Sequence, residues 1–109
     1  AYLYRPFHPG VLRLLKSVID AGHTGGIPVA MCGEMAGDPD AAVVLLGLGL
    51  DEFSMGAVGI PEVKRIIRSV ALSEAEEIVG NVLEMRSADE IDKYIRDTME
   101  KRFGVTHYE

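Results

Sequence analysis

Residues Ile27 to Pro39, which read IPVAMCGEMAGDP, decide the fold of this chain. The first half is a run of apolar residues closed by Cys32, and it predicts a buried strand over residues 27–31. The second half is a small, acidic, glycine-containing turn that leads into a helix. Loops that leave the carboxyl ends of parallel strands line the crevice where α/β folds bind ligands. The stretch therefore predicts that Cys32 lies at the edge of such a crevice.

The flanking sequence alternates between helical and extended patterns. After Pro9, apolar residues recur at intervals of three and four and predict an amphipathic helix of about three turns, ended by a group of glycines. Asp38 and Pro39 form a helix start, because an Asp side chain caps free amides and Pro suits the first helical position. We expect a helix over 41–46 ended by Gly47 and Gly49, a strand over 51–55 and a helix over 61–69.

The last third of the chain contains two matches to the capping box, in which Ser and Glu satisfy each other's free backbone amides. They lie at residues 73–76 and 87–90. They predict helices over about 74–85 and 88–103, the second closed by Gly104. We expect the tail, 105–109, to be frayed.

The order helix, strand, helix, strand, helices predicts an α/β fold with a parallel sheet. Two short strands are too few for a stable parallel sheet, since both edges would present unpaired backbone groups. The missing strands belong either to a longer parent chain or to further copies of this chain. The chain begins at Ala1 within an apolar, aromatic segment, and we expect it to be a fragment.

Composition excludes some classes of function. The chain has 109 residues, of which 48% are hydrophobic, and a formal charge of −6 without a basic cluster. Nucleic-acid binding requires a stripe of Lys and Arg, so we expect no nucleic-acid ligand. The sequence has no apolar run of about eighteen residues, and we expect no membrane insertion. A single cysteine fits a reducing compartment, and we expect a cytoplasmic protein.

Two roles for Cys32 remain open from the residues alone. A cysteine on an apolar strand is most often an inert core residue. At a strand end, a thiol can instead act as an acid, a base or a nucleophile. No Ser/His/Asp or Cys/His spacing in the sequence selects a catalytic triad.

The acidic residues after Cys32 also have two interpretations. Glu34, Asp38 and Asp40 offer oxygen ligands for a hard cation such as magnesium. A solvated loop with a helix cap explains the same residues and is favoured. The three histidines have no metal-ligand spacing: His8, His23 and His107.

Several segments together resemble one known family. They are Phe7–Pro9, Val11–Leu12, Val18–Ala21, Met31–Asp38, Leu45–Met55 and Ile60–Lys64. They are similar to the carboxyl-terminal end of Enzyme I, the phosphoenolpyruvate-protein phosphotransferases of the bacterial sugar phosphotransferase system. The match runs in order from Tyr2 to about Ser69 and continues loosely through the final helices. The Cys-Gly-Glu turn is shared with pyruvate phosphate dikinase, whereas the GLDEFSM and IPEVK segments look specific to Enzyme I.

This resemblance implies the fold class: a carboxyl-terminal fragment of a (β/α)8 TIM barrel that binds phosphoenolpyruvate. Residues 1–70 would supply the last two β/α units and residues 71–109 the terminal helices. The family dimerises through its barrel, so the resemblance also implies a homodimer.

The resemblance further implies roles for individual residues. Cys32 would be the proton donor to the enolate of pyruvate that forms when phosphoenolpyruvate gives its phosphoryl group to an enzyme histidine. Gly33 and Glu34 would lie beside the substrate, and Ser54 and Met55 would line the barrel mouth. The cofactor would be Mg2+, with its ligands upstream of Ala1. A histidine-containing phosphocarrier protein would be the partner, reached through a domain that this chain does not contain.

Two alternatives to this function stay open. The same cysteine chemistry occurs in pyruvate phosphate dikinase and phosphoenolpyruvate synthase, so the chain can be a fragment of either. It can also be a non-catalytic, self-associating α/β module in which Cys32 is structural.

Overall fold

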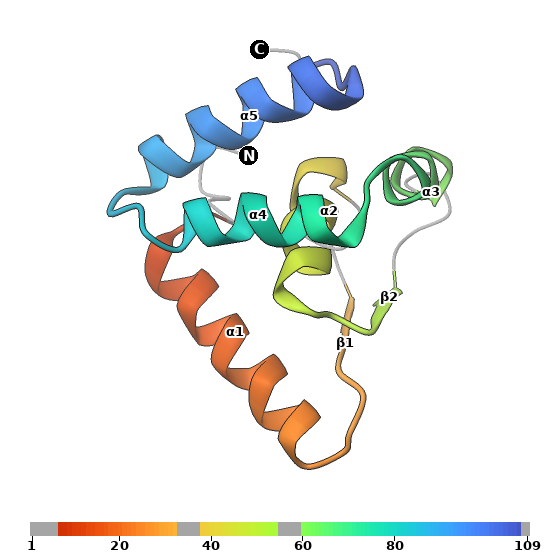
Figure 1. Ribbon diagram of the computed structural model, residues 1–109, viewed down its shortest axis with the longest axis vertical. Helices are drawn as coiled ribbons and strands as arrows, with labels where there is room; N and C mark the ends of the chain where they lie inside the picture. The colour runs from red at the N-terminus through yellow and green to blue at the C-terminus, as the bar shows by residue number, and fades with distance from the viewer. Residues whose placement is uncertain (1–6, 33–37, 55–59, 108–109) are drawn as a thin grey trace.

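The computed structural model describes residues 7–32, 38–54 and 60–107, without the side chains of Cys32, Phe53, Ser54 and Ile60. Its elements follow the predicted order (Figure 1). They are α1 (Pro9–Thr24), β1 (Ala30–Cys32), α2 (Pro39–Leu48), β2 (Glu52–Ser54), α3 (Ile60–Ser69), α4 (Leu72–Val82) and α5 (Ala88–Phe103). None of the helices in these ranges is both long and apolar enough to cross a membrane.

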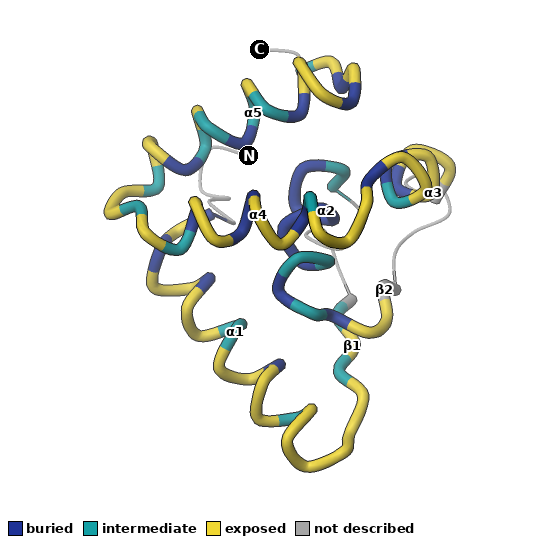
Figure 2. The backbone as a smooth tube through the Cα atoms, viewed as in Figure 1, coloured by how far each residue is buried: buried dark blue, intermediate teal, exposed yellow. Residues whose placement is uncertain are grey.

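Helix α2 occupies the middle of the molecule, and α1, α3, α4 and α5 all pack against it (Figure 1). Its residues from Ala41 to Leu45 are buried, as is Leu48 (Figure 2). A helix that is apolar on all sides is one that other elements surround. The expected helix over 41–46 therefore exists, and it is longer and more central than the sequence indicated.

Gly47 lies inside α2 and does not end it, which corrects the predicted boundary. The helix ends at Gly49, whose φ of 101° lies in the left-handed region that glycine adopts without strain. At Gly47, a Cβ atom would collide with the backbone carbonyl of Ala75 and the side chain of Val79 in α4. Gly47 therefore permits the close crossing of α2 and α4.

Strands β1 and β2 are parallel, as predicted, and pair in the register Ala30 with Glu52, Met31 with Phe53 and Cys32 with Ser54. The expected strand over 27–31 is wrong in its bounds and its burial. Pairing starts at Ala30, and Ile27 is 62% exposed. The prediction failed because an apolar run indicates burial only where neighbouring strands and helices cover it.

Helix α1 has the predicted period, but much of its apolar face lies at the surface. Leu12 and Ile19 are buried, whereas Leu14 is 64% exposed and Val18 is 51% exposed. Val11 is exposed as well. Only one side of α1 packs against α2. The rest of the apolar face predicted from the sequence is therefore exposed, and no other described residues bury it (Figure 2).

One of the two predicted capping boxes is wrong. Ser87 caps α5 by accepting a hydrogen bond from the Glu90 amide at 3.1 Å, and Gly104 ends that helix with a φ of 65°. Helix α4 instead begins after Ala71, which makes no side-chain cap, and Ser73 lies within its first turn. The Ser-x-x-Glu pattern at residues 73–76 therefore starts two residues too late.

The tail is packed as far as His107, contrary to the expected fraying. Val105 is buried, and its amide donates to the carbonyl of Met99. The His107 side chain is 12% exposed. Burial of apolar surface and two ring hydrogen bonds hold this segment against α5 and α2.

Candidate functional site

The parallel pairing brings the carboxyl ends of β1 and β2 together. Cys32, the last residue of β1, is paired with Ser54, the last residue of β2. Cys32 thus has the backbone position that the sequence predicted. The other predicted substrate-lining residues, Gly33, Glu34 and Met55, lie outside the described residues.

The chain returns to described structure at the start of α2. Asp38 caps this helix, and its Oδ1 accepts a hydrogen bond from the Asp40 amide at 3.0 Å. Burial raises the pKa of Asp38, against the opposing effect of the amides of Asp40 and Ala41. The favoured interpretation of Asp38 as a helix cap is confirmed.

Asp40, in the first turn of α2, forms a cluster with two residues from the other end of the chain. The Nε2 atom of His107 lies 2.5 Å from Oδ2 of Asp40, and its Nδ1 lies 2.7 Å from Oε2 of Glu100 in α5. The Asp40 side chain is only 8% exposed. Its Oδ1 is buried and has no hydrogen-bond partner within the described ranges.

The Asp40–His107 pair holds a proton more tightly than either group does alone. Burial raises the pKa of Asp40 to about 6, although the hydrogen bond from His107 opposes this rise. Burial lowers the pKa of His107, but the hydrogen bonds to Asp40 and Glu100 outweigh it and leave that pKa raised. The two groups titrate as a coupled pair.

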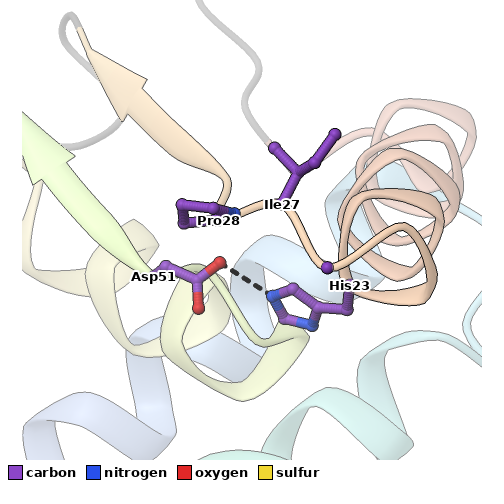
Figure 3. Close-up of a pocket in the computed structure, with 5 residues that line it drawn as sticks. His23, Ile27, Pro28 and Asp51 are labelled. Atoms are coloured by element: carbon purple, nitrogen blue, oxygen red, sulfur yellow. Dashed lines mark hydrogen bonds and ion pairs between the residues drawn. The ribbon is translucent and has the colours of Figure 1, made fainter.

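A second histidine–aspartate pair lies at the opposite, amino ends of the strands. Nε2 of His23 is 2.8 Å from Oδ2 of Asp51, and the Val29 amide donates to the same oxygen at 2.7 Å. Figure 3 shows both side chains beside Ile27 and Pro28 in a pocket of about 260 Å3. Because Asp51 precedes β2, this pocket lies at the other end of the strands from Cys32, and the pair fastens the end of α1 to the sheet.

Cation binding by the acidic residues gains no support from these contacts. Asp38 is engaged as a cap and Asp40 with His107. Within the described part of the chain, no group of three or more His, Cys, Asp or Glu side chains can hold a metal ion. The described residues thus do not fit a magnesium site.

The cluster of Asp40, Glu100 and His107 was not foreseen from the sequence. Asp40 and His107 are separated by 67 positions, and no motif connects them. The available signal was Gly104, because a helix-ending glycine allows the following residues to fold back over the helix.

Comparison with known proteins shows the family of this chain. Residues 1–72 match a family model described as PEP-utilising enzyme, PEP-binding domain. Three relatives carry the name phosphoenolpyruvate-protein phosphotransferase. The protein of Haemophilus influenzae is 47% identical over 97 residues, 89% of this chain. Those of Geobacillus stearothermophilus and Bacillus subtilis are 48% and 45% identical over 98 residues, 90% of this chain.

The chain spans 17% of the length of each of the three. With most of its length matched by the family model, the chain belongs to the PEP-utilising enzymes, as part of their PEP-binding domain.

Proposed function

We propose that this chain is part of a phosphoenolpyruvate-protein phosphotransferase and supplies the proton donor of its reaction. The observation that carries the proposal is the position of Cys32, which ends β1 beside the carboxyl end of β2. In parallel α/β folds, that edge of the sheet holds the reacting groups. The relatives reported above are named phosphoenolpyruvate-protein phosphotransferases, and their alignments cover 89% to 90% of this chain.

The chemistry of a thiol suits the step assigned to Cys32. When phosphoenolpyruvate transfers its phosphoryl group to an enzyme histidine, the C–O bond stays intact and the O–P bond breaks, so an enolate of pyruvate remains. A thiol with a pKa of about 8.5 is mostly protonated at neutral pH. It gives its proton to the methylene carbon and is left as a thiolate, which solvent protonates again.

We assign the remaining parts of the site to neighbouring residues of this chain and to another part of the protein. We propose Gly33 and Glu34 as substrate-lining residues, with Ser54 and Met55 at the mouth of a (β/α)8 barrel. Residues 1–70 would form the last two units of that barrel. Mg2+ would neutralise charge on the enolate and the phosphoryl group, through ligands in another part of the protein.

The proposal includes partners and a compartment. A histidine-containing phosphocarrier protein would receive the phosphoryl group, and the enzyme would act in the cytoplasm as a homodimer. The uncovered apolar side of α1 supports association with further protein, because apolar surface of this kind is usually buried in an assembly.

The names of the relatives favour this function over the other two that the sequence left open. A dikinase or synthase fragment would carry the same cysteine, but the relatives reported above are named phosphoenolpyruvate-protein phosphotransferases. A non-catalytic module would not need Cys32 at a strand end.

The decisive experiment follows exchange of the pyruvate methyl protons in heavy water by NMR, with Mg2+ present, for the protein in its full natural length. The group that protonates the enolate also removes a proton from pyruvate in the reverse direction. We expect Cys32→Ala to slow exchange by about 100-fold or more. Ser17→Ala, on the exposed side of α1, is the control and should exchange at the wild-type rate.

Exchange that persists in Cys32→Ala would overturn the role of the thiol. We expect the 109-residue chain alone to show no exchange, since it supplies one of several necessary groups.

A further inference from the structure

His107, in the tail that follows α5, lies between carboxylates of two helices. Its Nε2 lies 2.5 Å from Oδ2 of Asp40 in the first turn of α2, and its Nδ1 lies 2.7 Å from Oε2 of Glu100 in α5. A neutral imidazole has a single N–H group, so it donates to only one of two carboxylates, whereas an imidazolium donates to both. The geometry therefore matches a protonated ring that connects the tail to both helices.

The surroundings of this contact penalise loss of the ring proton. The His107 side chain is 12% exposed and the Asp40 side chain is 8% exposed. Oδ1 of Asp40 is buried and has no hydrogen-bond partner in the part of the chain described. A buried carboxylate of this kind is unfavourable unless a positive charge lies against it. Once His107 is neutral, release of the tail would return the Asp40 carboxylate to water and relieve this penalty.

The charged groups near the pair are mostly acidic. Asp38 adds negative charge from α2, and Asp92 adds it from α5. Arg96 on α5 adds positive charge. Glu100, which contacts the ring, adds a further negative charge. Among the described residues, this balance favours a protonated ring.

Helix α5 itself has attachments that do not involve His107. Nη1 of Arg102 lies 3.1 Å from Oε1 of Glu77 in α4. Nη1 of Arg65 in α3 donates to the carbonyl of Phe103 at 3.3 Å. Because an arginine keeps its proton across the neutral range, these links remain when His107 becomes neutral.

The tail, residues 104–107, has weaker attachments of its own. The amides of Gly104 and Val105 donate to the carbonyl of Met99 near the end of α5. Hydrogen bonds at a helix end open readily unless packing holds them. Val105 is buried, and the ring of His107 fastens the chain two residues beyond it. Release of the ring would therefore let the tail leave its packed position.

We propose that the tail, residues 104–107, is a proton-dependent strap: protonated His107 fastens it against the first turn of α2 through Asp40, and loss of that proton releases it while α5 stays attached. Release exposes the Asp40 carboxylate and the Val105 side chain to solvent. The strap is independent of the reaction proposed above, because it involves none of the residues assigned to that reaction.

The test measures hydrogen–deuterium exchange of the full-length protein by peptide mass spectrometry from pH 6.5 to 9. Rates are divided by the intrinsic rates at each pH to give protection factors. Because hydrogen bonds to charged groups are stronger than neutral ones, we expect protection of residues 104–107 to fall about tenfold or more over this range. Protection of residues 91–99 of α5 should change little. In His107→Gln, protection of the tail should be low already at pH 6.5 and nearly independent of pH.

Glu100→Gln is the second variant, and it serves also if His107→Gln fails to fold, because the Glu100 side chain is 48% exposed. The hydrogen bond to Glu100 helps to raise the pKa of His107. Removal of this charge should therefore shift the fall in tail protection to lower pH. His23→Gln is the matched control, since it breaks the other histidine–aspartate pair of the described chain and should leave the tail profile unchanged.

Three outcomes would overturn the proposal. The first is a tail protection in His107→Gln that equals that of wild type or is lowered by the same factor at every pH, as a purely structural role would give. The second is a Glu100→Gln profile that is not shifted. The third is a loss of protection that affects α5 and the tail equally, because helix and tail would then open together.

Discussion

At the scale of single residues, the buried pair of Asp40 and His107 makes the stability of the fold depend on pH. Both groups have raised pKa values, so the folded state binds protons that the unfolded state releases. Stability falls with rising pH wherever the folded state binds more protons. We expect the free energy of unfolding to decrease first as pH rises from the pKa of Asp40 in the unfolded chain to its pKa in the folded protein. A second decrease should follow as pH rises from 6.5 through the raised pKa of His107.

Asp40→Asn should flatten the first of these two decreases. A rise in the Asp40 pKa from 3.8 to about 6 corresponds to up to about 3 kcal/mol in the free energy of unfolding. The fall in stability between pH 4 and pH 7 should therefore be smaller in Asp40→Asn than in wild type by up to this amount. Urea unfolding followed by circular dichroism measures the difference.

Asp51→Asn is the contrasting variant. A hydrogen bond from the Val29 amide, followed by that from His23, lowers the pKa of Asp51, so this carboxylate contributes stability above pH 3.8 that is lost on acidification. Asp51→Asn should lower stability more at pH 7 than at pH 3. Equal pH dependence of the two variants would contradict the assignment of the raised pKa to Asp40.

At the scale of elements, the crossing of α2 and α4 depends on the missing side chain of Gly47. Alanine favours a helix interior over glycine by about 1 kcal/mol, yet at this position its Cβ would strike the carbonyl of Ala75. Backbone cannot move aside as a flexible side chain can. The collision should outweigh the gain in helix propensity.

We expect Gly47→Ala to lower the free energy of unfolding by about 1 to 3 kcal/mol. Gly80→Ala is the matched control, because Gly80 is exposed in α4 and its added Cβ would have no atom within 4 Å. That variant should be stabilised by about 0.5 to 1 kcal/mol. Thermal unfolding of the two variants side by side gives the comparison, and a stabilised Gly47→Ala would refute the close crossing.

Caps show how far local sequence determines an element. Ser87 and Gly104 delimit α5 as predicted, because their hydrogen bonds and backbone angles involve residues within one turn. Ser73 has the same local pattern as Ser87 without the same role. Helix α4 begins earlier because the amides of Glu74 and Ala75 both donate to the carbonyl of Ala71, so the chain is already helical at Ser73.

At the scale of the whole molecule, the uncovered side of α1 predicts association of the isolated chain. Leu14 and Val18 are more than half exposed, at 64% and 51%. Burial of such side chains between copies contributes about 25 cal/mol per Å2 of apolar surface. Both edges of the two-stranded sheet offer further pairing sites within the described residues.

We expect sedimentation velocity of the 109-residue chain to show concentration-dependent association. Leu14→Lys should shift it toward the monomer, since the substitution places a charge on the exposed apolar face. Ser69→Lys on α3 adds the same charge at an exposed position away from this face and should have no such effect. A monomer at every concentration, with cooperative unfolding, would contradict the prediction.

Much of this protein was determined by its sequence alone: the order of elements, the cap at Asp38, the ends of α5, the parallel strands and the family that the Cys-Gly-Glu segment indicates. The order of elements and the helix ends depend on hydrogen bonds and periodicities that neighbouring residues complete among themselves, and two strands joined through a helix are expected to be parallel. Only the tertiary structure decided the central place of α2, the approach at Gly47 and the exposed side of α1. It also decided the contact of His107 with Asp40, 67 positions away. Such contacts arise when separately formed helices pack, so their residues share no local pattern from which the pairing can be predicted.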